Sequence, residues 1–157
     1  MNKISLGLTT LLVIAAVNFL IFQKEDTLTQ GQTMLLRLAP RDPRSLIQGD
    51  YMVLRYALAQ EVPTKQLQDK GYLVLSLGGN NLGQFIRLHQ GEDLQPGEHL
   101  LFYRNRQGLR LGAESFFFQE GDAELYATAR YGELKVDPTG ASVLVGLRGE
   151  NFNILGK

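Results

Sequence analysis

The sequence Gly49-Asp50-Tyr51-Met52-Val53-Leu54-Arg55-Tyr56 is the stretch around which the fold is organised. From Tyr51 to Leu58 apolar and mixed side chains alternate, which predicts a β-strand. The apolar face, which we expect to enter the core, holds Met52, Leu54, Tyr56 and Leu58. The other face, whose mixture is typical of partial exposure, holds Tyr51, Val53, Arg55 and Ala57.

The segment before this strand is rich in proline and arginine. Pro40 and Pro43 exclude a central strand and stiffen the connection. Asp50 opens the strand, where we expect its carboxylate to accept backbone N–H bonds at the turn. The candidate binding residues of this region are Asp42, Arg44, Asp50, Tyr51 and Arg55. The positions expected to shape the motif itself are Pro43, Gly49, Leu54 and Tyr56.

The rest of the chain after residue 32 reads as short strands separated by turns. Gly78-Gly79-Asn80-Asn81 and Asp137-Pro138-Thr139-Gly140 are typical hairpin turns, and a further hairpin closes around residues 105–108. The additional strands are expected at 33–38, 72–77, 82–89, 98–104, 109–113, 116–118, 132–136 and 141–147. Short helices are expected at 121–130 and, as an alternative to a loop, at 63–70. We expect Phe116 to Phe118 to be core rather than a recognition surface. The pattern predicts a mainly β fold, a small antiparallel barrel or sandwich with one or two short helices.

The N-terminal segment Ile4–Phe22 carries no charged residue. As a helix it reaches roughly 28 Å, close to the hydrocarbon thickness of about 30 Å. Its length favours a transmembrane signal anchor over a cleaved signal peptide, whose apolar core usually has about 7–15 residues, and over a buried soluble helix. We therefore expect an anchor at 1–23, a linker at 24–32 and a β-rich domain at 33–157.

The charges at either end of this segment predict its orientation. Lys3 and the free amine favour a cytoplasmic N-terminus, whereas Glu25 and Asp26 offset Lys24 on the other side. The expected location is the bacterial inner (cytoplasmic) membrane, with a single pass and a periplasmic or otherwise extracytoplasmic C-terminal domain.

The composition argues against several activities. The net charge is zero, so no overall field attracts nucleic acid. The chain has no cysteine, which removes disulfides, thiolate nucleophiles and cysteine-ligated zinc. Because only His89 and His99 offer imidazoles, we expect no metal site and no cofactor.

A hydrolase of the signal-peptidase type is the weakest hypothesis. Leu46-Ile47-Gln48-Gly49-Asp50 before a strand is similar to the segment near the nucleophile of such enzymes. They need a serine a few residues earlier and a lysine base on a neighbouring strand. Arg41 occupies the place of the serine, and Lys65 and Lys70 lie in a polar segment. We expect no enzymatic activity.

The run Gly49-Asp50-Tyr51-x-x-Leu54-x-Tyr56 resembles the pattern that names the GDYXXLXY family of uncharacterised bacterial proteins. The approach 42–46, the Glu120-Gly121 pair and the segment 134–137 with Gly140 are also similar to that family. Gln119 departs from it, since proline is expected there in many relatives. The resemblance implies a small membrane-anchored protein, often encoded beside multi-spanning membrane proteins, and supplies no catalytic residues.

Two functions follow as hypotheses. The first is a non-enzymatic accessory or scaffold protein, tethered to the bilayer by Ile4–Phe22, whose face near the motif binds a multi-spanning membrane protein. The alternative is an extracytoplasmic module that binds a glycan or peptide.

Overall fold

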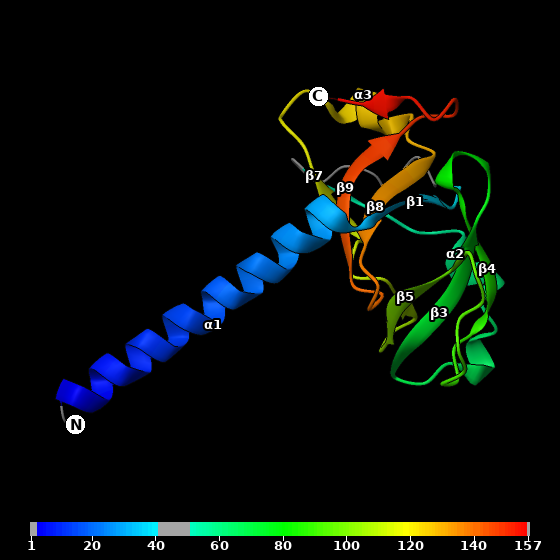
Figure 1. The fold of residues 1–157 in the computed structure, drawn as a ribbon. Helices are drawn as coiled ribbons and strands as arrows, with labels where there is room; N and C mark the ends of the chain where they lie inside the picture. Colours follow the sequence, from blue (N-terminus) through cyan, green and yellow to red (C-terminus); the bar gives the residue numbers. More distant parts are fainter. Residues whose placement is uncertain (1–2, 41–50, 157) are drawn as a thin grey trace.

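The computed structural model describes residues 3–40 and 51–156, which form one long helix and a β-rich domain (Figure 1). Asp42, Pro43, Arg44, Gly49 and Asp50 lie outside the described residues. The predicted fold class is confirmed, because an N-terminal apolar helix is followed by antiparallel sheets and short helices.

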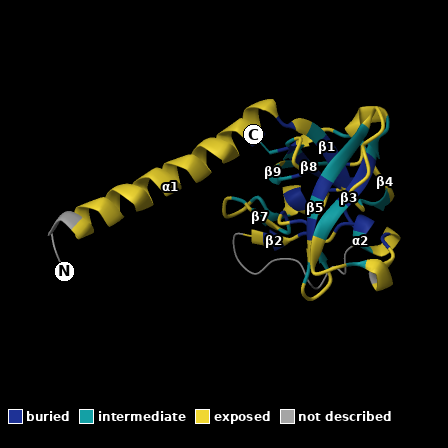
Figure 2. Cartoon of the chain, turned by 60° about the horizontal axis from the view of Figure 1, so that its bottom comes forward, coloured by how far each residue is buried: buried dark blue, intermediate teal, exposed yellow. Residues whose placement is uncertain are grey.

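Helix α1 (Lys3–Gln30) projects from the domain as a single rod (Figure 1). Its most apolar 18-residue window, within Ser5–Gln30, has a mean hydropathy of 2.2, and the helix is long and apolar enough to cross a membrane, as an anchor or as a signal sequence. The domain buries none of the most apolar window, as Figure 2 shows by its exposed colouring. The polar side chains within it are satisfied inside the helix: Thr9 and Asn18 donate to the carbonyls of Ser5 and Ile14 at 2.9 and 2.8 Å. These internal bonds lower the cost of placing polar groups in lipid.

The segment 24–32, predicted as a linker, is helical as far as Gln30. Tertiary contacts explain the difference. Thr27 is only 3% exposed, and its hydroxyl lies 3.1 Å from the Asp137 carboxylate in the turn between two strands. The Gly31 N–H then bonds to the Thr27 carbonyl at 3.0 Å and ends the helix against the domain. Helix α1 therefore joins the domain through a packed junction.

Two four-stranded antiparallel sheets and one two-stranded ribbon form the domain. The first sheet has the order β1 (Gln32–Arg37), β8 (Tyr131–Val136), β9 (Ser142–Arg148) and β10 (Ile154–Leu155). The second has the order β4 (Gly83–Leu88), β3 (Lys70–Leu77), β5 (Glu98–Asn105) and β6 (Leu109–Arg110). The ribbon pairs β2 (Tyr51–Val53) with β7 (Ser115–Phe117). The short helices are α2 (Leu58–Glu61), η2 (Thr64–Gln66), η3 (Gly79–Asn81) and α3 (Ala123–Ala127).

The turns that connect these strands follow the predicted turn residues. Asn80 and Asn81 adopt φ of 58° and 59° between β3 and β4, a left-handed conformation that asparagine tolerates. Gly140, with φ of 84°, closes the β8–β9 hairpin, and Gly108, with φ of 104°, closes the β5–β6 hairpin. The Asp137 carboxylate accepts N–H bonds from Thr139 at 2.9 Å and Ala141 at 3.1 Å, which holds the β8–β9 turn.

One hydrophobic core lies between the sheets and takes residues from all of them. The motif contributes three buried side chains to it, as predicted, and Leu58 just after the motif adds a fourth: Met52, Leu54, Tyr56 and Leu58. Around them lie Met34 and Leu36 of β1, Leu73 and Leu75 of β3, Leu101 of β5 and Leu134 of β8. Figure 2 shows the buried colouring inside the domain, including parts of β3 and β5, and the exposed colouring on α1 and many of the loops.

The single strand expected at 51–58 is wrong beyond Val53, although its buried face is right. The strand ends because its partner β7 begins at Ser115. The Leu54 N–H makes one more backbone bond toward the β7 segment, to the Glu114 carbonyl at 2.7 Å. The chain then crosses to the end of β1, where the Ala57 N–H bonds to the Arg37 carbonyl at 2.9 Å. Helix α2 starts at the next residue.

Candidate functional site

The β2–β7 ribbon presents an exposed aromatic pair next to the motif. Tyr51 and Phe117 lie directly opposite each other in the ladder, and their ring centroids are 5.7 Å apart. Tyr51 is 37% exposed and Phe117 is 73% exposed, and Val53 is an exposed neighbour on the same strand face as Tyr51. An exposed apolar cluster of this kind marks a candidate contact surface. We call Tyr51, Val53 and Phe117 the aromatic ribbon face.

The expectation that Phe116 to Phe118 all enter the core is wrong for Phe117. Phe116 and Phe118 are partly buried and pack against the core, where their rings lie 4.9 and 5.4 Å from that of Tyr126. Phe117 points the other way because successive side chains of a strand alternate. The period of two was available in the sequence, and applying it to this aromatic run would have identified the exposed ring.

Arg55 is exposed after the end of β2, and its role in binding stays a prediction. It lines a cavity of about 420 Å³ beside the motif, together with Val53, Gln60, Arg110 and Glu114. Tyr51 is not among the residues that line this cavity, so the structure does not bring Tyr51 and Arg55 into one pocket. The remaining candidates, Asp42, Arg44 and Asp50, fall in the segment that the structure does not describe.

Leu54 and Tyr56 are both core residues. The Tyr56 hydroxyl donates a hydrogen bond of 2.6 Å to the Ala113 carbonyl, as expected for a buried tyrosine that needs a partner. Burial raises the pKa of Tyr56 well above its usual value, and the nearby Glu114 carboxylate adds to the effect. Both causes keep the hydroxyl protonated as a donor, and no reactive phenolate is indicated.

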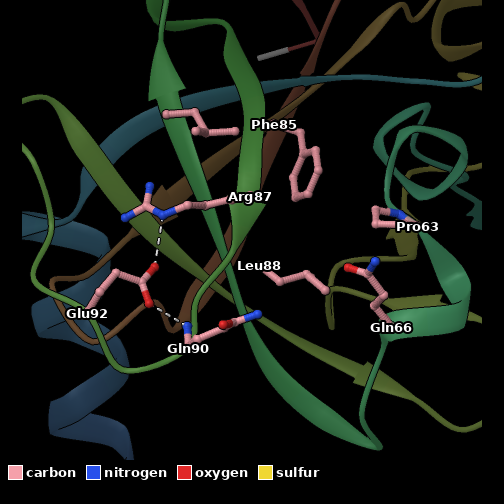
Figure 3. A pocket seen from close by; sticks show the side chains of 8 residues that line it. Pro63, Gln66, Phe85, Arg87, Leu88, Gln90 and Glu92 are labelled. Carbon is pink, nitrogen blue, oxygen red and sulfur yellow. Dashed lines mark hydrogen bonds and ion pairs between the residues drawn. The ribbon is translucent and has the colours of Figure 1, made fainter.

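A second cavity, of about 350 Å³, lies between β4 and the Pro63–Gln66 segment (Figure 3). The cation that lines this cavity, Arg87, is already neutralised by the carboxylates of Glu92 and Glu98. Arg87 Nε lies 2.9 Å from Glu92 Oε1, and its Nη1 and Nη2 lie 2.5 and 3.0 Å from the two Glu98 oxygens. Such a two-pronged pair has little charge left for a ligand. This arginine network is therefore best explained as a link between β4 and β5 across the strand that separates them, β3.

The Arg87–Glu98 pair predicts a pH-dependent stability. The hydrogen bonds from Arg87, and next from the Gln95 N–H, lower the pKa of Glu98 below its usual value. A carboxylate whose pKa is lower in the folded state stabilises the fold at pH values above its unfolded-state pKa, about 4.3 for glutamate. This stabilisation is lost as the pH falls through the folded-state pKa. We expect Glu98→Gln to lower the thermal midpoint at pH 7 and to lose most of this effect at pH 3. The exposed Glu150→Gln is the control. An equal effect of Glu98→Gln at both pH values would contradict the pairing.

Metal-binding chemistry finds no support in residues 3–40 and 51–156, where no group of three or more histidine, aspartate or glutamate side chains is placed to hold an ion. Of the candidate site residues, the structure brings Tyr51 together with an aromatic neighbour, Phe117, and leaves Arg55 in a separate cavity. The arrangement of the aromatic pair fits contact with another molecule's surface.

Comparison with known proteins gave one match. The model of a family described as GDYXXLXY protein matches residues 13–147, from within α1 to the end of the β9 region. Searches of curated proteins and of solved structures found no match.

Proposed function

The chain belongs to the GDYXXLXY protein family, and from this premise we propose that it is a membrane-anchored accessory protein without enzymatic activity of its own. The family match confirms the resemblance drawn from the motif. In this proposal α1 remains in the bacterial inner membrane as a single pass, and the β domain lies on the periplasmic side. The domain holds a multi-spanning membrane protein through the aromatic ribbon face.

The exposed Tyr51–Phe117 pair is the observation that carries the proposal. Strand β7 lies on the side of the domain from which α1 projects, in both Figure 1 and Figure 2. The ribbon face is therefore on the side that a membrane protein beside the anchor would approach. Tyrosine and phenylalanine are enriched in the cores of protein interfaces, where one aromatic anchor commonly supplies about 2 kcal/mol or more.

The rigid junction between anchor and domain supports the same proposal. Thr27 is buried against the Asp137 turn, so the direction of α1 and the position of the ribbon face are coupled. A domain on a flexible tether would lose more entropy on binding, whereas a preorganised one loses less. This geometry suits a partner that also lies in the membrane.

Photo-crosslinking in native membranes tests the proposal. With benzoylphenylalanine in place of Phe117, we expect one discrete protein adduct, identified by mass spectrometry as a multi-spanning membrane protein. The same probe in place of Ile154, which is 64% exposed on β10, should give no such adduct. We expect Tyr51→Ala with Arg55→Ala to weaken recovery of the partner by about 30-fold, the equivalent of about 2 kcal/mol. Unchanged recovery would exclude this face, and adducts with lipid alone would assign it to the bilayer.

The alternative, a module that binds a glycan or peptide, has support from the cavity beside Arg55. A volume of about 420 Å³ is within the range of small-ligand sites, about 300–1,000 Å³. If this alternative holds, a uronic-acid oligosaccharide should raise the thermal midpoint of the wild type but not that of Arg55→Gln. No shift in the wild type would remove the acidic-glycan version of the alternative.

A further inference from the structure

Three cations stand in a row across the second sheet. Lys70 of β3 pairs directly with Arg104 of β5, and Arg104 pairs directly with Arg110 of β6. Directly opposed residues share one face of a sheet, and like charges in that position destabilise it. All three side chains are exposed, and the ion pairs within the described part of the chain use other cations, namely Arg87, His89 and Arg148. The row therefore carries a positive charge that no ion pair among the described residues neutralises.

The row borders a cavity that also reaches the membrane helix. The cavity, of about 640 Å³, is lined by Arg104 and Arg110 from the second sheet, by Arg106 from the turn between β5 and β6, and by Lys24 from α1. Phe102 forms part of its wall, and the Arg104 guanidinium carbon lies 5.7 Å from the centre of that ring. Arg104 and Arg106 also border an adjoining hollow that contains Lys70. We call Lys24, Lys70, Arg104, Arg106 and Arg110 the basic cavity.

Two carboxylates face these hollows and leave most of the positive charge in place. Glu114 lines the larger cavity, and its Oε1 accepts the N–H groups of Leu111 and Gly112. Asp69 lines the adjoining hollow beside Lys70, with no ion pair to it within 4 Å in the described structure. Five cations and two carboxylates make a site that selects an anion.

The position of Lys24 places this cavity at the membrane surface. Lys24 follows the last residue of the apolar segment, Phe22, by two positions on the same helix. At about 1.5 Å per residue this is about 3 Å along the axis, which is the level of the lipid headgroups when Ile4–Phe22 spans the hydrocarbon layer. Juxtamembrane clusters of lysine and arginine attract anionic lipids.

We propose that the basic cavity binds the phosphate of an anionic phospholipid headgroup. Arg104 is the central residue, because it joins the row across the sheet to the larger cavity. The lipid phosphate offsets the repulsion in the row, and Lys24 contacts it from the anchor. The inference rests on the membrane anchoring of the proposed function and is independent of the partner at the aromatic ribbon face.

The test is native mass spectrometry of the full chain, released from micelles that contain equal amounts of phosphatidylglycerol and phosphatidylcholine. We expect the wild type to retain phosphatidylglycerol in clear preference. Arg104→Gln with Arg110→Gln should reduce that preference by about fivefold for each charge removed. The control, Lys65→Gln with Arg130→Gln, removes the same charge from exposed positions that line neither hollow and should keep the preference.

A stability measurement keeps the proposal testable by a second route. In micelles without anionic lipid, Arg104→Gln should unfold at the same temperature as the wild type or higher, because it relieves like-charge pairing with Lys70 and Arg110. Phosphatidylglycerol should raise the thermal midpoint of the wild type more than that of Arg104→Gln. Equal shifts in the two proteins would overturn the proposal.

The other outcomes are equally decisive. Equal retention of the two lipids by the wild type, or an equal loss of preference in the control, overturns the basic cavity as a lipid site. Displacement of phosphatidylglycerol by millimolar inorganic phosphate assigns the site to a free phosphate and overturns the lipid source. If the protein retains neither lipid and alkaline carbonate also extracts it from membranes, α1 is not a membrane anchor. This result would overturn the anchoring on which the inference rests.

Discussion

Tyr56→Ala is expected to destabilise the β domain by about 3–5 kcal/mol, the loss typical of a large aromatic side chain removed from a core. Tyr56 is only 4% exposed, and its ring lies against β8, where a Cβ added to Gly132 would come within 3.0 Å of it. Its hydroxyl also holds the Ala113 carbonyl at 2.6 Å. Because small domains are stable by about 5–15 kcal/mol, this one change removes much of the total.

Tyr56→Phe separates the contribution of the hydroxyl from that of the ring, and Tyr51→Ala serves as the control. Tyr56→Phe keeps the ring and leaves a buried acceptor unpaired, so we expect a loss of about 1–3 kcal/mol. Tyr51→Ala changes the same residue type in the same motif at an exposed position, and we expect a change within about 0.5 kcal/mol. The free energy of unfolding of these three variants is measured by urea unfolding of the full chain in micelles, monitored by near-ultraviolet circular dichroism. If Tyr51→Ala proved as costly as Tyr56→Ala, the assignment of the core face would be wrong.

Loosening the junction between α1 and the domain is expected to give the second large effect. The Asp137 carboxylate accepts the Thr139 hydroxyl at 2.6 Å and the Thr27 hydroxyl of α1 at 3.1 Å, besides two backbone N–H groups. Asp137→Ala removes all of these bonds, and we expect a loss of about 2–3 kcal/mol because the acceptor is charged. Thr27→Val leaves the other bonds of Asp137 in place and removes its bond to α1, together with the bond of the Thr27 hydroxyl to the Gln23 carbonyl inside the helix. It should loosen α1 while the β8–β9 turn stays formed.

Spin-label distances report the loosening directly. The chain has no cysteine, so cysteines introduced at Gln23 and Val145 carry labels without further changes. We expect a narrow distance distribution in the wild type and a broad one in Thr27→Val and Asp137→Ala. Thr29→Val is the matched control, since the Thr29 hydroxyl bonds only to the Glu25 and Asp26 carbonyls within α1. A narrow distribution in all variants would show that other contacts hold the helix.

The same junction should respond to acid. Burial alone would raise the pKa of Asp137, but the hydrogen bonds from Thr139, Ala141 and Thr27 outweigh it and lower that pKa below its usual value. The stabilisation is therefore complete above the unfolded pKa, about 3.9, and is lost as pH falls through the lower folded value. The distance distribution of the wild type should broaden in that range and that of Asp137→Ala should not change.

The core face of the motif could be read from the sequence, whereas its secondary structure could not. Met52, Leu54, Tyr56 and Leu58 are buried as their spacing predicts. The strand nevertheless ends at Val53, because pairing depends on where β7 starts, more than sixty residues later. Local alternation carries no information about that distant partner.

The candidate site shows the same division. Tyr51 is exposed as expected, and a period of two in the sequence is enough to expose Phe117 as well, but the ladder that makes these two rings neighbours is a tertiary contact. The expected linker at 24–32 is helical because Thr27 meets Asp137, a residue 110 positions away. The row of Lys70, Arg104 and Arg110 depends on strand register, which no single segment of the sequence specifies.

By itself, the sequence determined that this protein has an apolar N-terminal helix, a mainly β domain and the motif that places it in its family. Those features are local, since they depend on hydrophobic runs, on a period of two and on turn residues. Only the tertiary structure decided which side chains become neighbours: the aromatic ribbon face, the junction of α1 and the basic cavity. Each of these joins residues far apart in the chain, and their contacts follow from strand register and packing.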